Sequence, residues 1–241
     1  MKNKILLGVN IDHAATLRQV RGGTTSYPDL LQMTKIVKAG GGHQITIHLR
    51  EDRRHIQDED VVLLCKKSGL PINLEMAVSD EMLKIALKNK PKWVCFVPEK
   101  REELTTEGGL NILKVFAKIK KMTKLLHKAG IKVSFFIEAN LEQVTASAMA
   151  GADAVEFHTG HWVLSSGKTK ARLWSHLTEC SLKANQSKMR VHAGHGLDFA
   201  HTEIIKKLPH LKEVNIGHSL ICYSLEMGLQ KSTRKMLEKL K

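Results

Sequence analysis

Residues 71–98, PINLEMAVSDEMLKIALKNKPKWVCFVP, contain a complete strand–helix–strand pattern. The apolar run 71–76 predicts one strand, and the run 93–98 predicts another. Ser79 is a typical N-cap for a helix between them, and Pro91 follows the predicted end of that helix. The second run has no strict alternation of polar and apolar residues, which is typical of a parallel sheet covered on both faces. The stretch therefore predicts two parallel strands joined by a helix.

The same pattern repeats along the chain about every 30 residues, which is the size of one strand–helix unit. Eight strands are predicted, at 4–10, 44–49, 71–76, 93–98, 132–137, 154–158, 189–193 and 213–217. Helices are predicted at 28–39, 79–89, 110–128, 141–150, 171–185, 199–207 and 220–240. The segment 160–170 (GHWVLSSGKTK) has a flexible composition and is predicted to be a loop, either a lid or a crossover.

Eight alternating units can close into a barrel or form an open, doubly wound sheet. No glycine-rich dinucleotide fingerprint follows the first strand, where the open sheet would place it. The chain of 241 residues has the usual length of an eight-stranded α/β barrel, about 250 residues. We therefore expect a single (β/α)8 TIM barrel over residues 1–241.

The chain is basic, with 38 Lys and Arg against 24 Asp and Glu and a net charge of +14. Much of the excess is lysine in predicted helices, and aromatic residues make up only 5%. This pattern favours a solvated basic surface with a phosphate-binding site over a nucleic-acid-binding protein. The four cysteines form no CxxC pair, and no signal or membrane segment is evident. We expect a cytoplasmic protein that binds neither membrane nor nucleic acid.

Polar residues gather where the predicted strands end, and in a barrel the loops after those ends build the active site. Glu75 and Glu156 lie within apolar strands, where a carboxylate has a high desolvation cost unless it is paired or used. His48 also lies within a strand pattern. Two glycine-bearing ends, Gly194-His195-Gly196 and Gly217-His218, come before predicted helices and suit the binding of a phosphate. Alone, these residues predict a barrel enzyme acting on small anionic metabolites.

The motifs GVNIDHAATLRQVRGG, ITIHLREDRRHI, NLEMA, VPEKREELTTEGGL, EFHTG, AGHGL and NIGH occur in this order between about residues 5 and 230. This set resembles the pyridoxine 5′-phosphate synthase family. The resemblance implies the condensation of 1-deoxy-D-xylulose 5-phosphate with 3-amino-2-oxopropyl phosphate to pyridoxine 5′-phosphate, inorganic phosphate and water. It also implies a homo-octamer, with no cofactor and no metal ion.

The resemblance further implies roles for individual residues. His48 and Glu75 would accept protons, His195 would donate one, and Glu156 would stabilise developing positive charge. Other residues would hold the two substrates: Asn10, Asp12, His13, Arg21, Arg50, His55 and Thr105. Gly196, Gly217 and His218 would contact the amine substrate or its product.

Three departures from the family pattern bear on substrate affinity. Cys222 and Tyr223 stand where the family commonly has Gly-Arg, His192 precedes the AGHG motif, and residues 41–43 replace an acidic turn. Because of the Cys222-Tyr223 departure, one alternative is a member of this family that has lost turnover. A metal-dependent barrel hydrolase is a further alternative, although Asn10-Ile11-Asp12-His13 lacks the His-x-His pattern of such enzymes. A basic RNA-binding protein without activity is the third, and its binding would depend strongly on salt.

Overall fold

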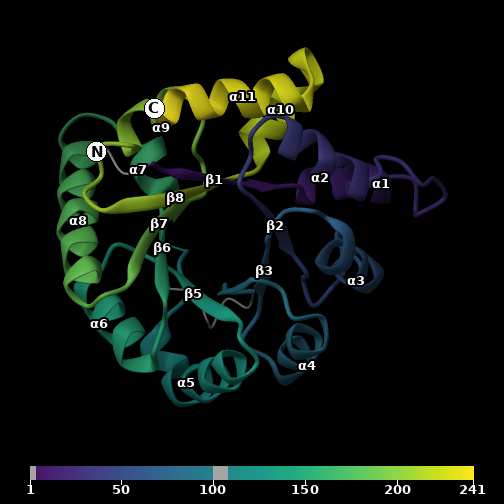
Figure 1. Ribbon diagram of the computed structural model, residues 1–241. Helices are drawn as coiled ribbons and strands as arrows, with labels where there is room; N and C mark the ends of the chain where they lie inside the picture. Colours follow the sequence, from purple (N-terminus) through teal and green to yellow (C-terminus); the bar gives the residue numbers. More distant parts are fainter. Residues whose placement is uncertain (1–3, 100–107) are drawn as a thin grey trace.

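The computed structural model describes residues 4–99 and 108–241, and its eight strands form a closed parallel barrel in which each pairs with the next and β8 pairs with β1. Figure 1 looks into the ring of strands and the helices around it. The predicted barrel is confirmed. The strands are β1 (Leu6–Asn10), β2 (Gln44–His48), β3 (Ile72–Met76), β4 (Trp93–Phe96), β5 (Lys132–Ile137), β6 (Ala154–His158), β7 (Arg190–Gly194) and β8 (Leu211–Ile216).

Helices surround the barrel, and α11 packs against α2, α9 and α10 on one side of the ring (Figure 1). The helices are α1 (Asp12–Gln19), α2 (Leu30–Ala39), α3 (Asp58–Lys67), α4 (Asp80–Asn89), α5 (Ile112–Lys128), α6 (Leu141–Ala150), α7 (Gly160–Leu164), α8 (Gly167–Gln186), α9 (Phe199–Ile205), α10 (His218–Met227) and α11 (Leu229–Leu240). Over residues 4–99 and 108–241, no helix combines the length and the apolarity needed to cross a membrane.

The hydrophobic core lies between the barrel and its helices. Alternate strand residues such as Leu74, Val133 and Phe157 are fully buried and belong to this core. Because side chains alternate between the two faces of a strand, the residues between them point into the barrel. Those inward residues are largely polar, unlike the branched apolar residues that usually fill such barrels.

Hydrogen bonds between strands satisfy this polar interior. Asn215 on β8 accepts a bond from the Thr46 hydroxyl at 2.9 Å and donates one to the Glu156 carboxyl at 2.7 Å. Lower in the barrel, the Gln44 amide donates to the Glu213 carboxyl at 2.9 Å. Buried polar groups need such partners to offset desolvation. These hydrogen bonds therefore link three strands, β2, β6 and β8, at the base of the mouth.

The helical part departs from the sequence prediction in four places. The prediction of a loop over 160–170 is wrong, because α7 occupies its first half and α8 begins at Gly167. Trp162 explains why this segment is helical, since its buried ring packs against Trp174 with ring centroids 5.5 Å apart. The helix predicted at 220–240 is two helices, divided at Gly228, whose φ is +82°. Helices α1 and α3 were not predicted.

Candidate active site

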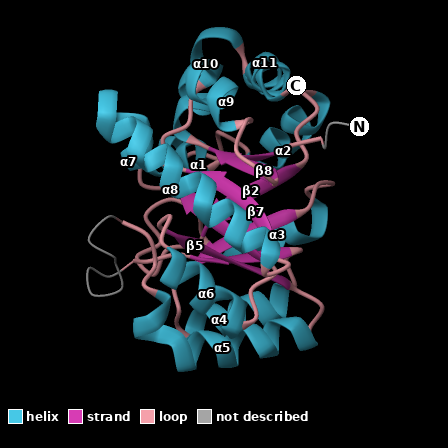
Figure 2. Ribbon diagram, turned by 90° about the vertical axis from the view of Figure 1, so that its left-hand side faces the viewer, coloured by secondary structure: helices cyan, strands magenta, loops and turns pink. Residues whose placement is uncertain are grey.

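A cavity of about 700 Å³ opens at the mouth formed by the carboxyl ends of the strands. In Figure 2, α7, which follows β6, lies on the left, and the chain's N-terminus lies on the right, so the mouth faces left. Polar and titratable side chains from six strand ends line the cavity together with Phe136, Leu197 and Ile216. Parallel strands bring their carboxyl ends together, so residues far apart in sequence meet here.

Ten of the residues singled out in the sequence line this cavity: Asn10, His13, His48, Arg50, Glu75, Glu156, His195, Gly196, Gly217 and His218. Asp12 and His55 lie just behind the wall, in contact with residues that line it. Arg21 lies in the exposed segment after α1 and does not line the cavity of its own chain. Thr105 falls outside the described residues. The structure brings most of these residues together, and their roles stay predictions.

Asp12 ties the first two strand ends together. One carboxylate oxygen accepts a bond from the backbone N–H of His48 at 2.9 Å, and the other accepts from the Asn10 amide at 2.7 Å. Burial raises the pKa of Asp12 to about 6, although the charge of His48 and these hydrogen bonds act in the opposite direction. Asp12 therefore anchors His48 and Asn10 and is poised to titrate near neutral pH.

His48 has a carboxylate partner that the sequence analysis did not single out. Its Nε2 lies 2.9 Å from Glu99 Oε1, and the other oxygen of Glu99 accepts the backbone N–H of Glu51 at 2.9 Å. Burial acts to raise the pKa of Glu99, but the hydrogen bonds from His48 and the Glu51 backbone, together with the charges of His48 and Arg50, hold it below its usual value. A carboxylate bonded to one ring nitrogen leaves the other nitrogen to accept a proton. The only sequence signal for Glu99 was its place just after the fourth strand.

We predict that Glu99→Gln lowers kcat about tenfold and changes KM little, because a neutral amide stabilises the protonated His48 ring less than a carboxylate does. Steady-state kinetics at several pH values would check this result. The exposed helical substitution Glu142→Gln is the matched control. An unchanged kcat for Glu99→Gln would mean that His48 works without its partner.

The half-buried Glu75 and the buried Glu156 interact across the floor of the cavity. Burial, followed by the charges of Glu156 and Asp12, raises the pKa of Glu75 well above its ordinary value. Burial and the charge of Glu213 raise the pKa of Glu156 to about 8, against the effect of its bond from Asn215. Gly194 makes room for Glu156, because a Cβ there would overlap Glu156 Oε1. Displaced pKa values of this kind mark groups suited to proton transfer.

The turn after β7 presents His195 in an unusual backbone conformation. Its φ is +74°, a left-handed value that costs energy for a residue with a side chain. The Thr159 hydroxyl fixes the turn by donating to the carbonyls of Gly194 at 2.8 Å and His195 at 2.6 Å. Burial, followed by His158 and His161, lowers the pKa of His195. The surrounding structure thus holds this imidazole in the cavity wall.

Arg50 is the arginine of its motif that faces the cavity. Arg53 is held by Asp58 at 3.0 Å and Arg54 by Asp52 at 2.6 Å, and neither lines the cavity. The Nε of Arg50 forms no hydrogen bond with the described residues, and the nearest carboxylate oxygen is 3.4 Å away on Asp52. A partly exposed guanidinium whose buried Nε forms no hydrogen bond suits a phosphate or carboxylate of a ligand.

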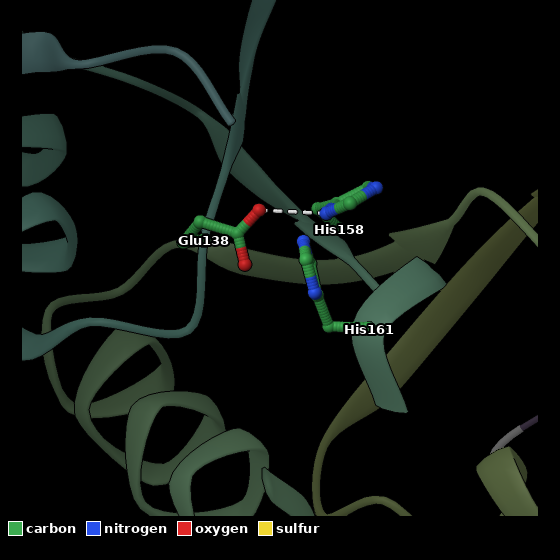
Figure 3. Close-up of side chains that lie close together, drawn as sticks. All are labelled: Glu138, His158 and His161. Atoms are coloured by element: carbon green, nitrogen blue, oxygen red, sulfur yellow. Dashed lines mark hydrogen bonds and ion pairs between the residues drawn. The ribbon is translucent and has the colours of Figure 1, made fainter. Parts of the chain in front are cut away.

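Beside this set, three side chains could hold a metal ion. Their potential ligand atoms all lie within 4.8 Å of one another, and among the residues that the structure describes they form the one such group found: Glu138, His158 and His161. Figure 3 shows Glu138 and His158 joined by a hydrogen bond, with the His161 ring alongside. His158 also lines the cavity. In the sequence, Glu138 directly follows the predicted strand 132–137 and His158 ends the predicted strand 154–158, and neither was assigned a role.

Comparison with known proteins gives one consistent family. The family model for pyridoxal phosphate biosynthesis protein PdxJ matches residues 7–241. A protein of Bdellovibrio bacteriovorus named pyridoxine 5′-phosphate synthase is 59% identical over 241 residues, with all of both chains covered. The protein of the same name from Aliivibrio fischeri is 48% identical over 237 residues, which cover 97% of this chain and 96% of the relative.

Solved structures support the fold. The 3-hexulose-6-phosphate synthase of Salmonella typhimurium superposes with a TM-score of 0.68 at 13% identity and covers 98% of each chain. KGPDC from Streptococcus mutans superposes with a TM-score of 0.65 at 11% identity and covers 99% of this chain and 98% of the other. At this level of identity, the likeness concerns the barrel alone.

Proposed function

This chain belongs to the PdxJ family of pyridoxal phosphate biosynthesis proteins and has pyridoxine 5′-phosphate synthase activity, and we propose that the cavity at the barrel mouth is the site of that reaction. The reaction joins 1-deoxy-D-xylulose 5-phosphate and 3-amino-2-oxopropyl phosphate into the pyridine ring, with release of phosphate and water. The observation that carries the proposal is the convergence of His48, Glu75, Glu156 and His195 on one cavity.

These four residues match the proton transfers that ring formation needs. An amine attacks a ketone, water and phosphate leave, and a carbon–carbon bond closes the ring, so protons must be both taken up and delivered. His48, supported by Glu99, and Glu75 are the proposed acceptors, and His195 is the proposed donor. With a pKa of about 8, Glu156 is mostly protonated in the empty site at pH 7. Positive charge on a bound intermediate favours the ionised form of Glu156, and the resulting carboxylate stabilises that charge.

We place the phosphate groups of the two substrates on two different sides of the cavity rim. On one side we place a phosphate on Arg50, near His13 and His55. On the other, α10 begins at His218 with Gly217 as its N-cap, and its first backbone N–H groups and positive dipole end favour an anion. Gly196 and Ser219 also line this side. We place the amine substrate or its product there.

We further propose that the protein is a cytoplasmic homo-octamer. The family assignment supports both parts of this proposal. The four cysteines are all free thiols, which is common in a reducing compartment. Size-exclusion chromatography with light scattering would test the octamer, and a monomer or dimer at micromolar concentration would contradict it.

The reaction is tested by mixing purified protein with both ketone phosphates and excess EDTA. Following pyridoxine 5′-phosphate by absorbance and mass, we expect turnover that EDTA does not reduce, because the proposed steps use side-chain acids and bases. Loss of turnover in EDTA with recovery on adding zinc would instead assign an essential metal to Glu138, His158 and His161. No product from folded protein would indicate a family member without turnover, and Cys222-Tyr223 would be examined first.

A further inference from the structure

The pair formed by Glu138 and His158 lies directly against the proposed proton donor. Glu138 Oε1 is 2.6 Å from His158 Nδ1, and each side chain is only 9% exposed (Figure 3). The rings of His158 and His195 have centroids 4.7 Å apart. The pair comes from the ends of β5 and β6, while His195 follows β7, so three neighbouring strands fix the arrangement.

The hydrogen bond determines which nitrogen of His158 is available. The Glu138 carboxylate accepts the Nδ1 proton, which leaves Nε2 to carry the second, transferable proton. That atom faces the same space as the His195 ring beside Gly160. A Cβ on Gly160 would lie 2.8 Å from His158 Nε2 and 2.9 Å from His195 Cδ2. A glycine at this position lets the two rings approach each other.

This arrangement favours proton chemistry over metal binding. Two of the three potential ligand atoms, Glu138 Oε1 and His158 Nδ1, already share a proton in a short hydrogen bond. A metal ion would have to replace that bond, although it would regain energy from coordination. The carboxylate–histidine pair instead fixes the orientation and tautomer of an imidazole next to the cavity.

We propose that His158, held by Glu138, is a positioning residue that supplies the proton which His195 donates. The inference rests on the proposed function, in which His195 is the donor. It also answers a difficulty in that role, because burial and the neighbouring histidines lower the pKa of His195 and so disfavour its protonated form. The groups that face His158 and set its charge are Glu138, His161 and His195.

The proton count closes over one cycle. Protonated His195 transfers its proton to a departing oxygen of the substrate and becomes neutral. The freed electron pair on its ring nitrogen accepts the Nε2 proton of protonated His158. Neutral His158 keeps its Nδ1 proton on the bond to Glu138 and takes a new Nε2 proton from water at the mouth.

The test uses the full-length protein with His158→Gln and Glu138→Gln. We expect His158→Gln to lower kcat about 100-fold and to leave KM within about twofold, because a proton relay is lost and binding groups are kept. Glu138→Gln should lower kcat about tenfold, and Glu138→Asp should recover part of that loss. Histidine NMR titration supplies a readout besides activity. The pKa of His195 should rise in His158→Gln, since a neighbouring positive charge is removed.

His127→Gln is the matched control. His127 bonds the Asp153 carboxylate at 2.8 Å just before β6, at the opposite end of the barrel, and its kcat should not change. Thermal unfolding would confirm that each variant folds. If His158→Gln does not fold, the kinetics of Glu138→Gln provide the test. If the unaltered enzyme is active and both His158→Gln and Glu138→Gln keep its kcat, the inference is overturned. A loss expressed only in KM, or an unchanged His195 titration, would also overturn it. An inactive unaltered enzyme would instead refute the proposed function.

Discussion

Glu75→Gln is expected to lower kcat by about 10³-fold while the protein keeps its fold, which is the largest effect on activity that the site predicts. Glu75 faces the cavity, and its register partners on the neighbouring strands are His48 and Cys95. Its side-chain carboxyl forms no hydrogen bond with the described residues, so the barrel does not use that carboxyl for support. A carboxylate of raised pKa is a stronger base, and the amide that replaces it cannot accept the proton.

The stability of the Glu75 variant should match that of the unaltered protein or exceed it. The pKa of Glu75 is raised in the folded state above its ordinary value of 4.5, so folding favours its protonated form. The Glu75 carboxyl therefore lowers the free energy of unfolding progressively as pH rises above 4.5. Substitution by Gln removes this pH-dependent loss. Thermal unfolding at pH 5 and pH 8, together with steady-state kinetics, would check both parts.

Glu179→Gln makes the same chemical change on the exposed face of α8 and should leave kcat and the unfolding temperature unchanged. Normal turnover by Glu75→Gln would show that the proposed base is another group. Lost turnover together with a large fall in the unfolding temperature would show that Glu75 supports the barrel instead.

The strands were predictable because each is a short apolar run bounded by glycine, proline or polar residues. The missed helices have identifiable reasons. Helix α1 follows β1 after one residue and has no side-chain cap, so no boundary signal separates them. Helix α3 did carry a signal, since Asp58, Glu59 and Asp60 occupy its first turn and Lys66 and Lys67 its last. That charge pattern suits the helix dipole and predicts a helix at this position.

The site was predictable to the extent that barrel topology alone gathers strand ends. Glu75 and Glu156 stood out because carboxylates are rare within apolar strands. Pairs made between strands could not be read from the chain, since nothing local links His48 to Glu99 across 51 residues. The same holds for Glu138 and His158, which meet only when β5 pairs with β6.

The departures from the family pattern occupy different surroundings. Cys222 Sγ lies 3.6 Å from His218 Nε2 at the rim, while Tyr223 stacks on Phe199 at 4.2 Å. His192 is buried inside the barrel, where its Nδ1 lies 3.6 Å from Glu213. His43 accepts the backbone N–H of Leu7 at 3.0 Å, outside the cavity. Among these side chains, that of Cys222 contacts His218, which lines the cavity, so Cys222 is where we expect substrate affinity to differ.

Glu156→Gln should raise stability at high pH while it lowers activity. The pKa of Glu156 is about 8 in the folded protein and 4.5 ordinarily, so folding favours the protonated form. Between pH 4.5 and pH 8, rising pH lowers the free energy of unfolding, because Glu156 loses its proton in the unfolded chain before it does so in the folded protein. We expect Gln to raise the free energy of unfolding at pH 8 by an amount on the order of a few kcal/mol, with little difference at pH 4.5.

The hydrogen bond should survive this change, because the Gln carbonyl can accept the Asn215 amide as Glu156 does now. A neutral amide cannot stabilise positive charge on an intermediate, so kcat should fall by about 10²-fold. Urea unfolding from pH 4.5 to 8.5 and steady-state kinetics would measure both effects, with exposed Glu226→Gln on α10 as control. A stability difference that does not grow with pH would contradict the raised pKa. Stability gained as activity falls would mean that the barrel keeps a carboxyl group there for the reaction, at a cost to its own stability.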